Sequence, residues 1–373
     1  MEHKKLGDIA TYINGYAFKP QDRGEKGLPI IRIQDLTGNA YDVGFYDGDY
    51  PERIEINDGD ILISWSASLG VYIWDKGKAL LNQHIFKVVF DKIKVDKRYF
   101  VFAVQYKLKE MELKTHGATM KHIVKKDFDN TLIPFPSIKD QIEIANIISK
   151  ASEIISLRQE QLEKLEELIR ARFVEMFGSI HKSTEYPYFA VRELTDVISG
   201  GTPSREKNEY WDKGTIPWIK TTELQNNVIT VADEYITKEG LANSSAKLVP
   251  PGTVLVAMYG QGKTRGMTAY LDIEACTNQA CACILPSDRI DSMFMWKYFE
   301  LSYDKLRNLA QGAGQPNLNG NMIKNFQVLV PPEMMQKEYV DFVRQVDKSK
   351  DSVQKALDEA QLLFDSLMQQ YFG

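Results

Sequence analysis

Several features that would suggest a function at once are missing from this sequence. No apolar run is long enough to cross a membrane, and the start, residues 1–5, lacks the apolar stretch of a signal peptide, so we expect a cytoplasmic protein with no membrane partner. Only three cysteines occur, Cys276, Cys281 and Cys283, without C-x-x-C spacing or a nearby histidine. This predicts core cysteines, with neither a disulfide framework nor a bound metal.

The motifs of common catalytic and cofactor sites are also absent. No Gly-x-Gly-x-x-Gly follows a strand, no Ser, Cys or His arrangement suggests a nucleophile, and no Asn-Pro-Pro-Tyr-like segment occurs. Residues 257–264 come close to a phosphate-binding loop, but Ala257 stands where that motif needs glycine, and Arg265 begins a poor helix opening. We expect a loop between strands there, and no cofactor in this chain.

A strongly positive net charge is lacking as well. The 46 Lys and Arg residues are outnumbered by 51 Asp and Glu, which gives a net charge of −5, unlike a simple nucleic-acid binder. Residues 87–126 are locally basic, with eleven Lys or Arg against four Asp or Glu, and a face of this kind is able to follow a phosphate backbone. On charge alone, a solvated lysine-rich surface is the favoured interpretation.

What the sequence does contain is an internal repeat. Residues 176–178, Met-Phe-Gly, match residues 371–373, Tyr-Phe-Gly, at an offset of 195. Other matches keep the same order while the offset drifts by only a few residues, so the chain is a tandem duplication. They pair Leu6 with Leu194, Pro29 with Pro217, Arg32 with Lys220, Gly59 with Gly252, Asn82-Gln83 with Asn278-Gln279, Gly117 with Gly312, Pro136 with Pro331, and Gln141 with Gln336.

Each half begins with short β-branched and aromatic runs, punctuated by Gly, Pro, Asn and Asp and interspersed with helical stretches. A proline-marked end then leads into a long helix. The predicted fold class is α+β: two similar mixed α/β domains and two long helices, related by a pseudo-two-fold duplication. We place the first globular domain at 1–137, its helix at 138–178, a linker at 179–190, the second globular domain at 191–332 and its helix at 333–373.

Apolar residues recur every seven positions in both helices, and such stripes must pair with another helix. The two stripes most simply pair with each other, over about 36 residues or about 54 Å each. Polar residues within the stripes (Arg158, Arg172 and Lys350) fit control of register or further partners. The first helix has Ile148, Ile155, Leu162, Ile169 and Met176, with Ala151 and Leu165 between them; the second has Val343, Leu357, Phe364 and Tyr371, with Val346, Val353, Ala360 and Leu367.

Two globular halves, each closed by a heptad helix, resemble the specificity (S) subunit of type I restriction–modification systems, and the resemblance covers essentially the whole chain. The first half departs more, because His116-Gly117-Ala118-Thr119-Met120 replaces a Gly-Gln-Pro version. The local marks are Ser-Gly-Gly-Thr-Pro-Ser at 199–204, Lys-Thr-Thr-Glu-Leu at 220–224, Thr-Asn-Gln-Ala at 277–280, Gly-Ala-Gly-Gln-Pro-Asn-Leu at 312–318, and the proline-then-Gln helix opening at 136–145.

The resemblance implies that each globular half is a target recognition domain for one part of a split site in double-stranded DNA. The helices would form an antiparallel coiled coil that holds the domains apart. Two methyltransferase (M) subunits would dock on the helices and methylate adenine N6 with S-adenosylmethionine, acting on a base turned out of the stack. Restriction (R) subunits would add cleavage that depends on ATP and Mg²⁺. This chain would be non-catalytic and would supply only the recognition, with half-sites about one turn, ~34 Å, apart.

Base reading needs side chains that bond two base edges at once, namely Arg or Lys for guanine and Asn or Gln for adenine. Because Asn82-Gln83 and Asn278-Gln279 recur in both halves, a structural role is favoured for them, and residues that differ between the halves are better candidates. The candidates in the first half are Arg32, Gln34, Ser64, Trp65, Ser66, Ser68, Lys121 and His122. Those in the second half are Ser204, Arg205, Lys220, Thr221, Thr222, Tyr259, Gln261, Lys263, Arg265, Gln311, Gln315 and Asn317. For partner binding on the helices we expect Ile148, Ile155, Leu162, Ile169, Val346, Val353, Leu357, Phe364 and Leu367.

Two other interpretations stay open at this point. One is a coiled-coil adaptor whose globular halves bind protein or glycan, which a steep salt dependence of DNA binding would contradict. The other is a stand-alone methyltransferase or nuclease, against which the missing catalytic motifs argue.

Overall fold

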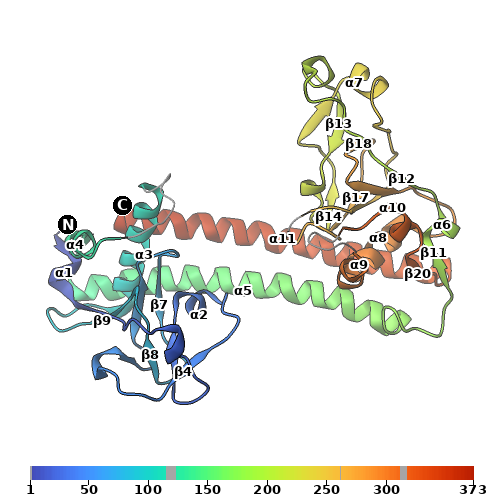
Figure 1. The fold of residues 1–373 in the computed structure, drawn as a ribbon. Coiled ribbons are helices and arrows are strands. Elements are labelled where there is room, and N and C mark those ends of the chain that lie inside the picture. Colours follow the sequence, from blue (N-terminus) through green and yellow to red (C-terminus); the bar gives the residue numbers. More distant parts are fainter. Residues whose placement is uncertain (1, 115–122, 261, 311–316) are drawn as a thin grey trace. The chain divides into compact units, whose positions relative to one another are not determined.

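The structure is a computed structural model of the chain and describes residues 2–114, 123–260, 262–310 and 317–373. Two compact units form: residues 1–159 with 354–373, and residues 160–353. Figure 1 shows that a long helix of each half, α5 (Ile138–Phe177) and α11 (Glu333–Phe372), contributes residues to both units.

The globular part of the first unit is a mixed arrangement of short strands and helices (Figure 1). Its strands are β1 (His3–Lys5), β2 (Thr11–Asn14), β3 (Leu28–Ile31), β4 (Gly44–Tyr46), β5 (Glu55–Ile56), β6 (Ile61–Ser64), β7 (Gly70–Ile73), β8 (Ala79–Leu81), β9 (Ile85–Val89) and β10 (Leu132–Pro134). Its helices are α1 (Leu6–Ile9), α2 (Ile33–Thr37), α3 (Lys97–Lys114) and α4 (Lys125–Asn130), with 3-10 turns at Pro20–Asp22 and Glu52–Ile54.

The second unit has a similar order of elements. Its strands are β11 (Tyr188–Ala190), β12 (Val197–Ser199), β13 (Ile216–Ile219), β14 (Asn227–Ile229), β15 (Glu234–Ile236), β16 (Val254–Ala257), β17 (Thr268–Leu271), β18 (Cys276–Thr277), β19 (Cys281–Ile284) and β20 (Gln327–Leu329). Its helices are α6 (Val191–Leu194), α7 (Lys238–Ala242), α8 (Ser292–Leu301), α9 (Tyr303–Leu309) and α10 (Gly320–Lys324), with 3-10 turns at Asn208–Tyr210 and Thr221–Glu223.

Sheet topology confirms the duplication. The first unit has sheets ordered β2-β9-β6-β7 and β4-β3-β8-β5, and the second has β12-β19-β16-β17-β14 and β15-β13-β18. In the β4-β3-β8-β5 and β15-β13-β18 sheets the pairs β3 with β8 and β13 with β18 are parallel, whereas β6 with β9 and β16 with β19 in the other sheets are antiparallel. Each unit also has a two-stranded antiparallel sheet, β1 with β10 in the first and β11 with β20 in the second. The long helix of each half follows the second strand of this sheet. The α+β fold class with two similar domains is therefore correct.

A buried glutamine explains the proline-then-Gln opening of each long helix. The Gln141 side chain accepts from the backbone N–H of Asp96 at 3.0 Å and donates to the carbonyl of Pro136 at 2.9 Å. Gln336 makes the equivalent bonds with the N–H of Asp291, at 2.9 Å, and the carbonyl of Pro331, at 2.7 Å. Since a buried amide group must be hydrogen-bonded, this bridge ties the start of each long helix to the start of the preceding domain helix.

The end of each long helix is anchored by a fully buried phenylalanine, which accounts for the repeated Phe-Gly. Phe177 packs edge-on against Phe294 of α8, with ring centroids 5.5 Å apart. Phe372 packs against Tyr99 of α3, with centroids 5.2 Å apart. Burial of each ring removes a large apolar area from water and fixes the helix end to its unit.

Within each unit the two long helices run antiparallel. In the second unit Arg172 bonds Glu338 at 2.7 Å while Lys350 bonds Glu166, so positions advance along α5 as they fall back along α11. In the first unit Ile148 near the start of α5 shares a core with Met368 near the end of α11. The predicted heptad residues are buried or half-buried, as a paired stripe requires. Within the described residues, no helix has both the length and the apolarity needed to span a membrane.

Candidate functional site

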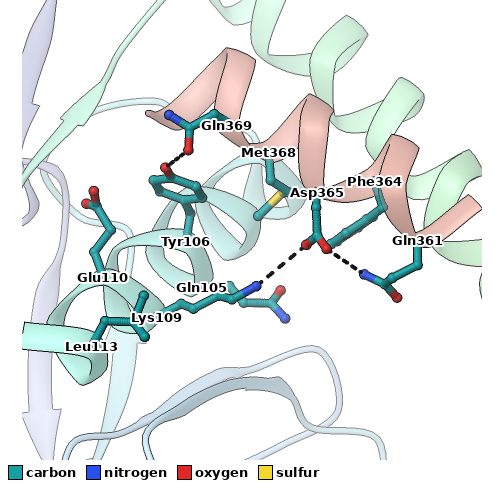
Figure 2. A pocket seen from close by; sticks show the side chains of 10 residues that line it. All are labelled: Gln105, Tyr106, Lys109, Glu110, Leu113, Gln361, Phe364, Asp365, Met368 and Gln369. Atoms are coloured by element: carbon teal, nitrogen blue, oxygen red, sulfur yellow. Dashed lines mark hydrogen bonds and ion pairs between the residues drawn. The ribbon is translucent and has the colours of Figure 1, made fainter. Parts of the chain in front are cut away.

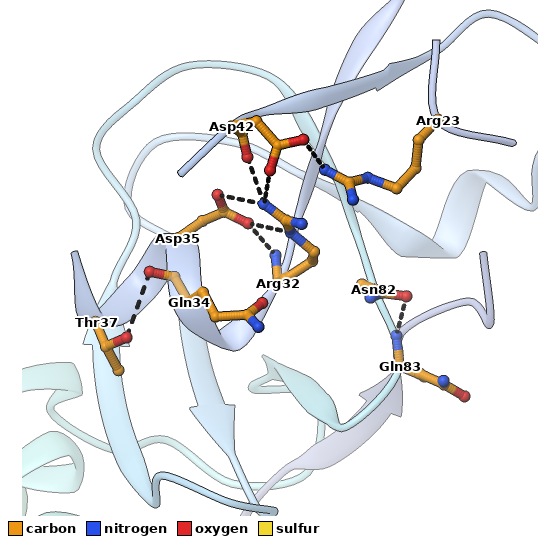
Figure 3. Close-up of polar contacts among 8 residues, drawn as sticks. All are labelled: Arg23, Arg32, Gln34, Asp35, Thr37, Asp42, Asn82 and Gln83. Carbon is orange, nitrogen blue, oxygen red and sulfur yellow. Dashed lines mark hydrogen bonds and ion pairs between the residues drawn. The ribbon is translucent and has the colours of Figure 1, made fainter. Parts of the chain in front are cut away.

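Arg32, a predicted base reader, is held by carboxylates in the structure (Figure 3). Its Nε donates to Asp35 Oδ2 at 3.0 Å, and its Nη2 donates to the main-chain oxygen of Asp42. Hydrogen bonding to Asp35 raises the pKa of Arg32, and Arg23 binds the same Asp42 carboxylate at 2.8 Å. Arg32 thus fastens α2 to the segment before β4, while Gln34, one turn on, is exposed.

The matching residue in the second half, Lys220, is engaged in the same way. Its Nζ lies 2.9 Å from Glu234, at the start of β15, which is the counterpart of β4. The backbone N–H of Lys220 donates to Glu223, just as that of Arg32 donates to Asp35. Both cations therefore belong to the repeated scaffold, which is a physical reason for their recurrence at matching positions.

Arg205 is also committed within the second unit. Its guanidinium stacks 3.6 Å from the Trp211 ring and binds Glu234 at 2.6 Å, and that bond is the main cause of the lowered pKa of Glu234. Among the other candidate base readers of the second unit, Thr221 is half-buried, whereas Ser204 and Thr222 are exposed.

The β6–β7 loop of the first unit presents hydroxyls of unequal accessibility. Ser64 is fully buried, and its Oγ donates to the carbonyl of Ser68. Its prediction as a DNA contact is therefore wrong for this conformation, because the hydroxyl faces the protein interior. Trp65 stacks on Phe86 with centroids 5.5 Å apart, while Ser66 is half-buried and Ser68 is exposed.

The corresponding β16–β17 loop of the second unit displays larger groups. Tyr259 and Lys263 are exposed and Arg265 is half-buried. The half-buried Asn317 lies next to this loop, because the following residue, Leu318, donates its N–H to the Met258 carbonyl at 3.0 Å. The segment is a strand–loop–strand connection with no helix after it, so it lacks the architecture of a phosphate-binding loop.

A second segment adjoins the matching loop of each unit. In the first unit, Ile123 donates its N–H to the Trp65 carbonyl at 3.0 Å, as Leu318 does to Met258 in the second. Ile123 and Leu318 therefore bond to matching loops of the two domains. The candidates that fall outside the described residues are Lys121, His122, Gln261, Gln311 and Gln315.

The recurring Asn-Gln pairs extend the parallel strand pairs β3–β8 and β13–β18. Asn82 donates its N–H to Ile31, and Asn278 donates its N–H to Ile219, both at 3.0 Å. A glycine packs against each junction: a Cβ at Gly15 would lie 2.0 Å from the Asn82 oxygen, and one at Gly200 would lie 2.1 Å from the Thr277 oxygen. Figure 3 shows the Asn82 side chain accepting from the Gln83 N–H. These contacts fit the structural role that we favoured for the pairs.

The basic stretch at 87–126 is paired in part within its unit. Lys87 lies 3.0 Å from Asp60, Lys107 2.9 Å from Glu110, and Lys125 2.6 Å from Asp129. These three pairs offset part of the local positive charge.

The cysteines are core residues. Cys276 lies in β18, and Cys281 and Cys283 lie in β19, all of them buried. Burial raises the pKa of the Cys276 thiol to about 11. In the part of the chain that the structure describes, no group of three His, Cys, Asp or Glu residues is arranged to hold a metal.

The nine helix residues that we expected to bind partners are buried or half-buried. Burial leaves little of this stripe open to another subunit, and a role of these residues in partner binding stays a prediction. Exposed apolar side chains lie on other faces of the same helices. On α5 they are Ile142, Ile147, Ile154, Leu157, Leu168 and Val174, and on α11 they are Met334, Leu362 and Leu363.

A pocket of about 640 Å³ lies between α3 and α11 of the first unit (Figure 2). Tyr106 donates to Gln369 at 2.6 Å across it, and Lys109 lies 3.6 Å from Asp365. The second unit has an equivalent of about 450 Å³ whose lining includes Glu300 of α8. These openings belong to the repeated packing of domain helix on long helix, and the second is also lined by Tyr303, which bonds to the β16–β17 loop.

Comparison with known proteins now adds the family. The chain matches the family model described as the type I restriction modification DNA specificity domain, over residues 1–167 and again over 184–361. The chain belongs to this family. Membership makes it a DNA-specificity component of a type I restriction–modification system, and the two matched segments follow its two repeats.

Individual relatives agree with this assignment. The chain is 28% identical to the specificity subunit of the type I restriction enzyme EcoBI of Escherichia coli, over 98% of this chain and 83% of that protein. Its fold is similar to the S subunit of M. genitalium, with TM-score 0.58 and 16% identity over 100% and 96% of the two chains. A structure described for the assembly and conformational transition of the type I system gives 0.59 and 15%, over 99% and 97%.

Sequence reasoning missed Tyr303 and Arg307 of α9. Both side chains contact the backbone of the β16–β17 loop, some forty residues earlier in the chain. Nothing in the sequence marks this contact, because neither the spacing nor the residue types form a motif.

Proposed function

We propose that the chain reads a bipartite DNA site, with one globular domain for each half-site. The proposal rests on one observation: the family match occurs twice, on two domains that share a scaffold but differ in the loops next to it. Two related domains with unlike loops suit a site whose halves have unlike sequences.

The division between scaffold and loops also separates the candidates. Arg32, Lys220 and the Asn-Gln pairs make the same contacts in both domains, so we assign them to the scaffold. The β6–β7 and β16–β17 loops differ in chemistry, with Ser66 and Ser68 in one and Lys263 and Arg265 in the other. A guanidinium can bond two acceptors of guanine at once, so Arg265 is our leading base reader.

The long helices are proposed as the spacer between the half-sites and as the docking surface for two methyltransferase subunits. Leu168 of α5 and Leu363 of α11 stand exactly 195 residues apart and are 46% and 53% exposed. Apolar side chains left in water at matching positions favour two equivalent contacts. S-adenosylmethionine would then bind in the M subunits, and ATP and Mg²⁺ in R subunits, while this chain performs no chemical step.

The test is co-expression of the chain with the candidate M subunits, followed by mapping of methylated adenines. We expect a split motif with a fixed gap, and exchange of residues 191–332 for those of a relative should change one half of it. Methylation without a split motif would contradict the proposal. DNA binding that is insensitive to salt would favour the adaptor alternative, and binding of S-adenosylmethionine by the purified chain would favour an enzyme.

A further inference from the structure

Side chains of α9, a helix of the same unit, hold the β16–β17 loop through hydrogen bonds to its backbone. Arg307 Nη1 donates to the carbonyl oxygens of Gly262 and Arg265, at 2.9 and 3.0 Å. Tyr303 Oη donates to the carbonyl oxygen of Lys263 at 2.7 Å and accepts from the same Arg307 nitrogen at 3.0 Å. Two side chains of α9 therefore engage three carbonyls within four residues of the loop.

We propose that Tyr303 and Arg307 are positioning residues that hold this loop in its base-reading conformation. The inference rests on the proposed function, since it assigns to α9 the placement of Lys263 and Arg265 against DNA. Neither Tyr303 nor Arg307 needs to touch a base for this role.

The loop needs such support because its backbone is permissive. Gly262 has φ 58° and Gly266 has φ 86°, conformations that glycine adopts freely and leaves as freely. A reading side chain must be held within a fraction of an ångström to distinguish base edges. Bonds from α9 to three carbonyls remove much of this freedom before DNA arrives, which lowers the ordering cost of binding.

The direction of these bonds also matters. Carbonyl oxygens of the loop turn toward α9, so these bonds fix the loop through its backbone and use none of its side chains. The guanidinium of Arg307 also brings a positive charge next to the loop, which favours an approaching phosphate backbone.

The two α9 side chains have no equivalents at the matching positions of the first half. At the 195-residue offset the first half has Leu108 where Tyr303 stands and Glu112 where Arg307 stands. Leu108 is buried in the core of the first unit and has no hydroxyl to donate. Loss of the α9 contacts should therefore affect one half-site and leave the other unchanged.

The experiment uses the full chain assembled with its M subunits and four variants. Tyr303→Phe keeps the ring, which packs near Gly266, and removes the bond to Lys263. Arg307→Met removes the guanidinium bonds, and Arg307→Lys restores a single donor. Asn308→Ala is the matched control, because Asn308 is an exposed neighbour on the same helix.

Two readouts are taken for each protein. Hydrogen–deuterium exchange over residues 258–267 measures the order of the loop, and methylation of a library randomised in both half-sites measures base preference. We expect Arg307→Met and Tyr303→Phe to speed exchange and to reduce discrimination at one or two base pairs of one half-site by about threefold to tenfold. Arg307→Lys should recover part of this loss, and Asn308→Ala should behave as the parent.

The possible results distinguish failure of the positioning role from failure of the proposed function. A split preference in the parent with no change in Arg307→Met, in either exchange or base preference, overturns the positioning role. Equal loss at both half-sites, or a fall in total methylation with preference unchanged, also overturns it, since a purely structural defect would act in that way. If the parent protein shows no split base preference, the proposed function is wrong. The positioning of a base reader is then wrong as well, even when hydrogen–deuterium exchange of the loop responds to the variants.

Discussion

Replacing Lys297 with methionine should destabilise the second unit strongly, although methionine fits an apolar site. Lys297 of α8 is 2% exposed, and its Nζ lies 3.0 Å from Glu300 and 3.8 Å from Asp347 of α11. The ammonium also lies 4.0 Å from the centre of the Trp296 ring. Because Glu300 is only 15% exposed, the substitution leaves a largely buried carboxylate without its nearest counter-charge.

Breaking a buried ion pair from one side costs about 3–5 kcal/mol. Glu300 keeps some solvent, and Lys350 stays in its neighbourhood, so we expect the lower end, about 3 kcal/mol. For a unit the size of residues 160–353, each kcal/mol moves the melting temperature by about 2–4 °C, which predicts a fall of roughly 6–12 °C by calorimetry.

The loss should depend on pH with a definite sign. Burial already raises the pKa of Glu300, and the Lys297 ammonium opposes that rise. Without the ammonium the folded-state pKa climbs further above the unfolded value near 4.5, so the folded variant binds a proton more tightly than the unfolded chain. The deficit relative to the parent should be largest above the variant's folded pKa and shrink as the pH falls from that value toward the parent's folded pKa.

A double-mutant cycle identifies the cause. Glu300→Gln removes the carboxylate, so Lys297→Met should cost at least about 1 kcal/mol less in that background than in the parent. A melting temperature lowered by less than 2 °C, or additive effects of the two substitutions, would refute the account of Lys297 and Glu300 as a coupled buried pair. It would leave apolar packing as the main link between α8 and the long helices.

Three further outcomes follow from the structure. Arg265→Ala should relax specificity at one base pair of one half-site, by about 1–3 kcal/mol, in a methylation library, and an unchanged site would exclude this residue as a reader. Leu168→Asp and Leu363→Asp should each lower the number of bound M subunits from two to one in native mass spectra, whereas Glu167→Asp should leave it at two. Gly200→Ala should reduce stability by about 1–3 kcal/mol in urea unfolding, because its Cβ would lie 2.1 Å from the Thr277 oxygen; Gly320→Ala, where a Cβ meets nothing within 4 Å, serves as the contrast for steric crowding.

Much of the architecture could be predicted because repetition is a property of sequence. The matches at a nearly constant offset required two copies of one fold, and the sheets of the two units have matching orders. Heptad spacing required each long helix to bury a stripe, which Ile169 and Val346 do in one core. Periodicity is readable without coordinates because a helix places every seventh residue on the same face.

The candidate site could be predicted only in part, because exposure and bonding partners depend on residues far away in the chain. Arg32 and Lys220 have the right chemistry for guanine, yet carboxylates of Asp35 and Glu234 engage them in the structure. Ser64 lies in a loop-like sequence but ends a buried strand. A side chain's type states what it is able to bind, while its neighbours decide whether it is free to bind DNA.

The sequence by itself determined the duplication, the helix stripes and the family resemblance, since these depend on order and spacing along one chain. Tertiary structure alone decided which equivalent residues became scaffold, which face of each long helix stayed exposed, and that α9 supports the β16–β17 loop. The physical reason is that hydrogen bonds and burial act through space, and folding brings Arg307 to within 2.9 Å of a carbonyl forty-five residues away.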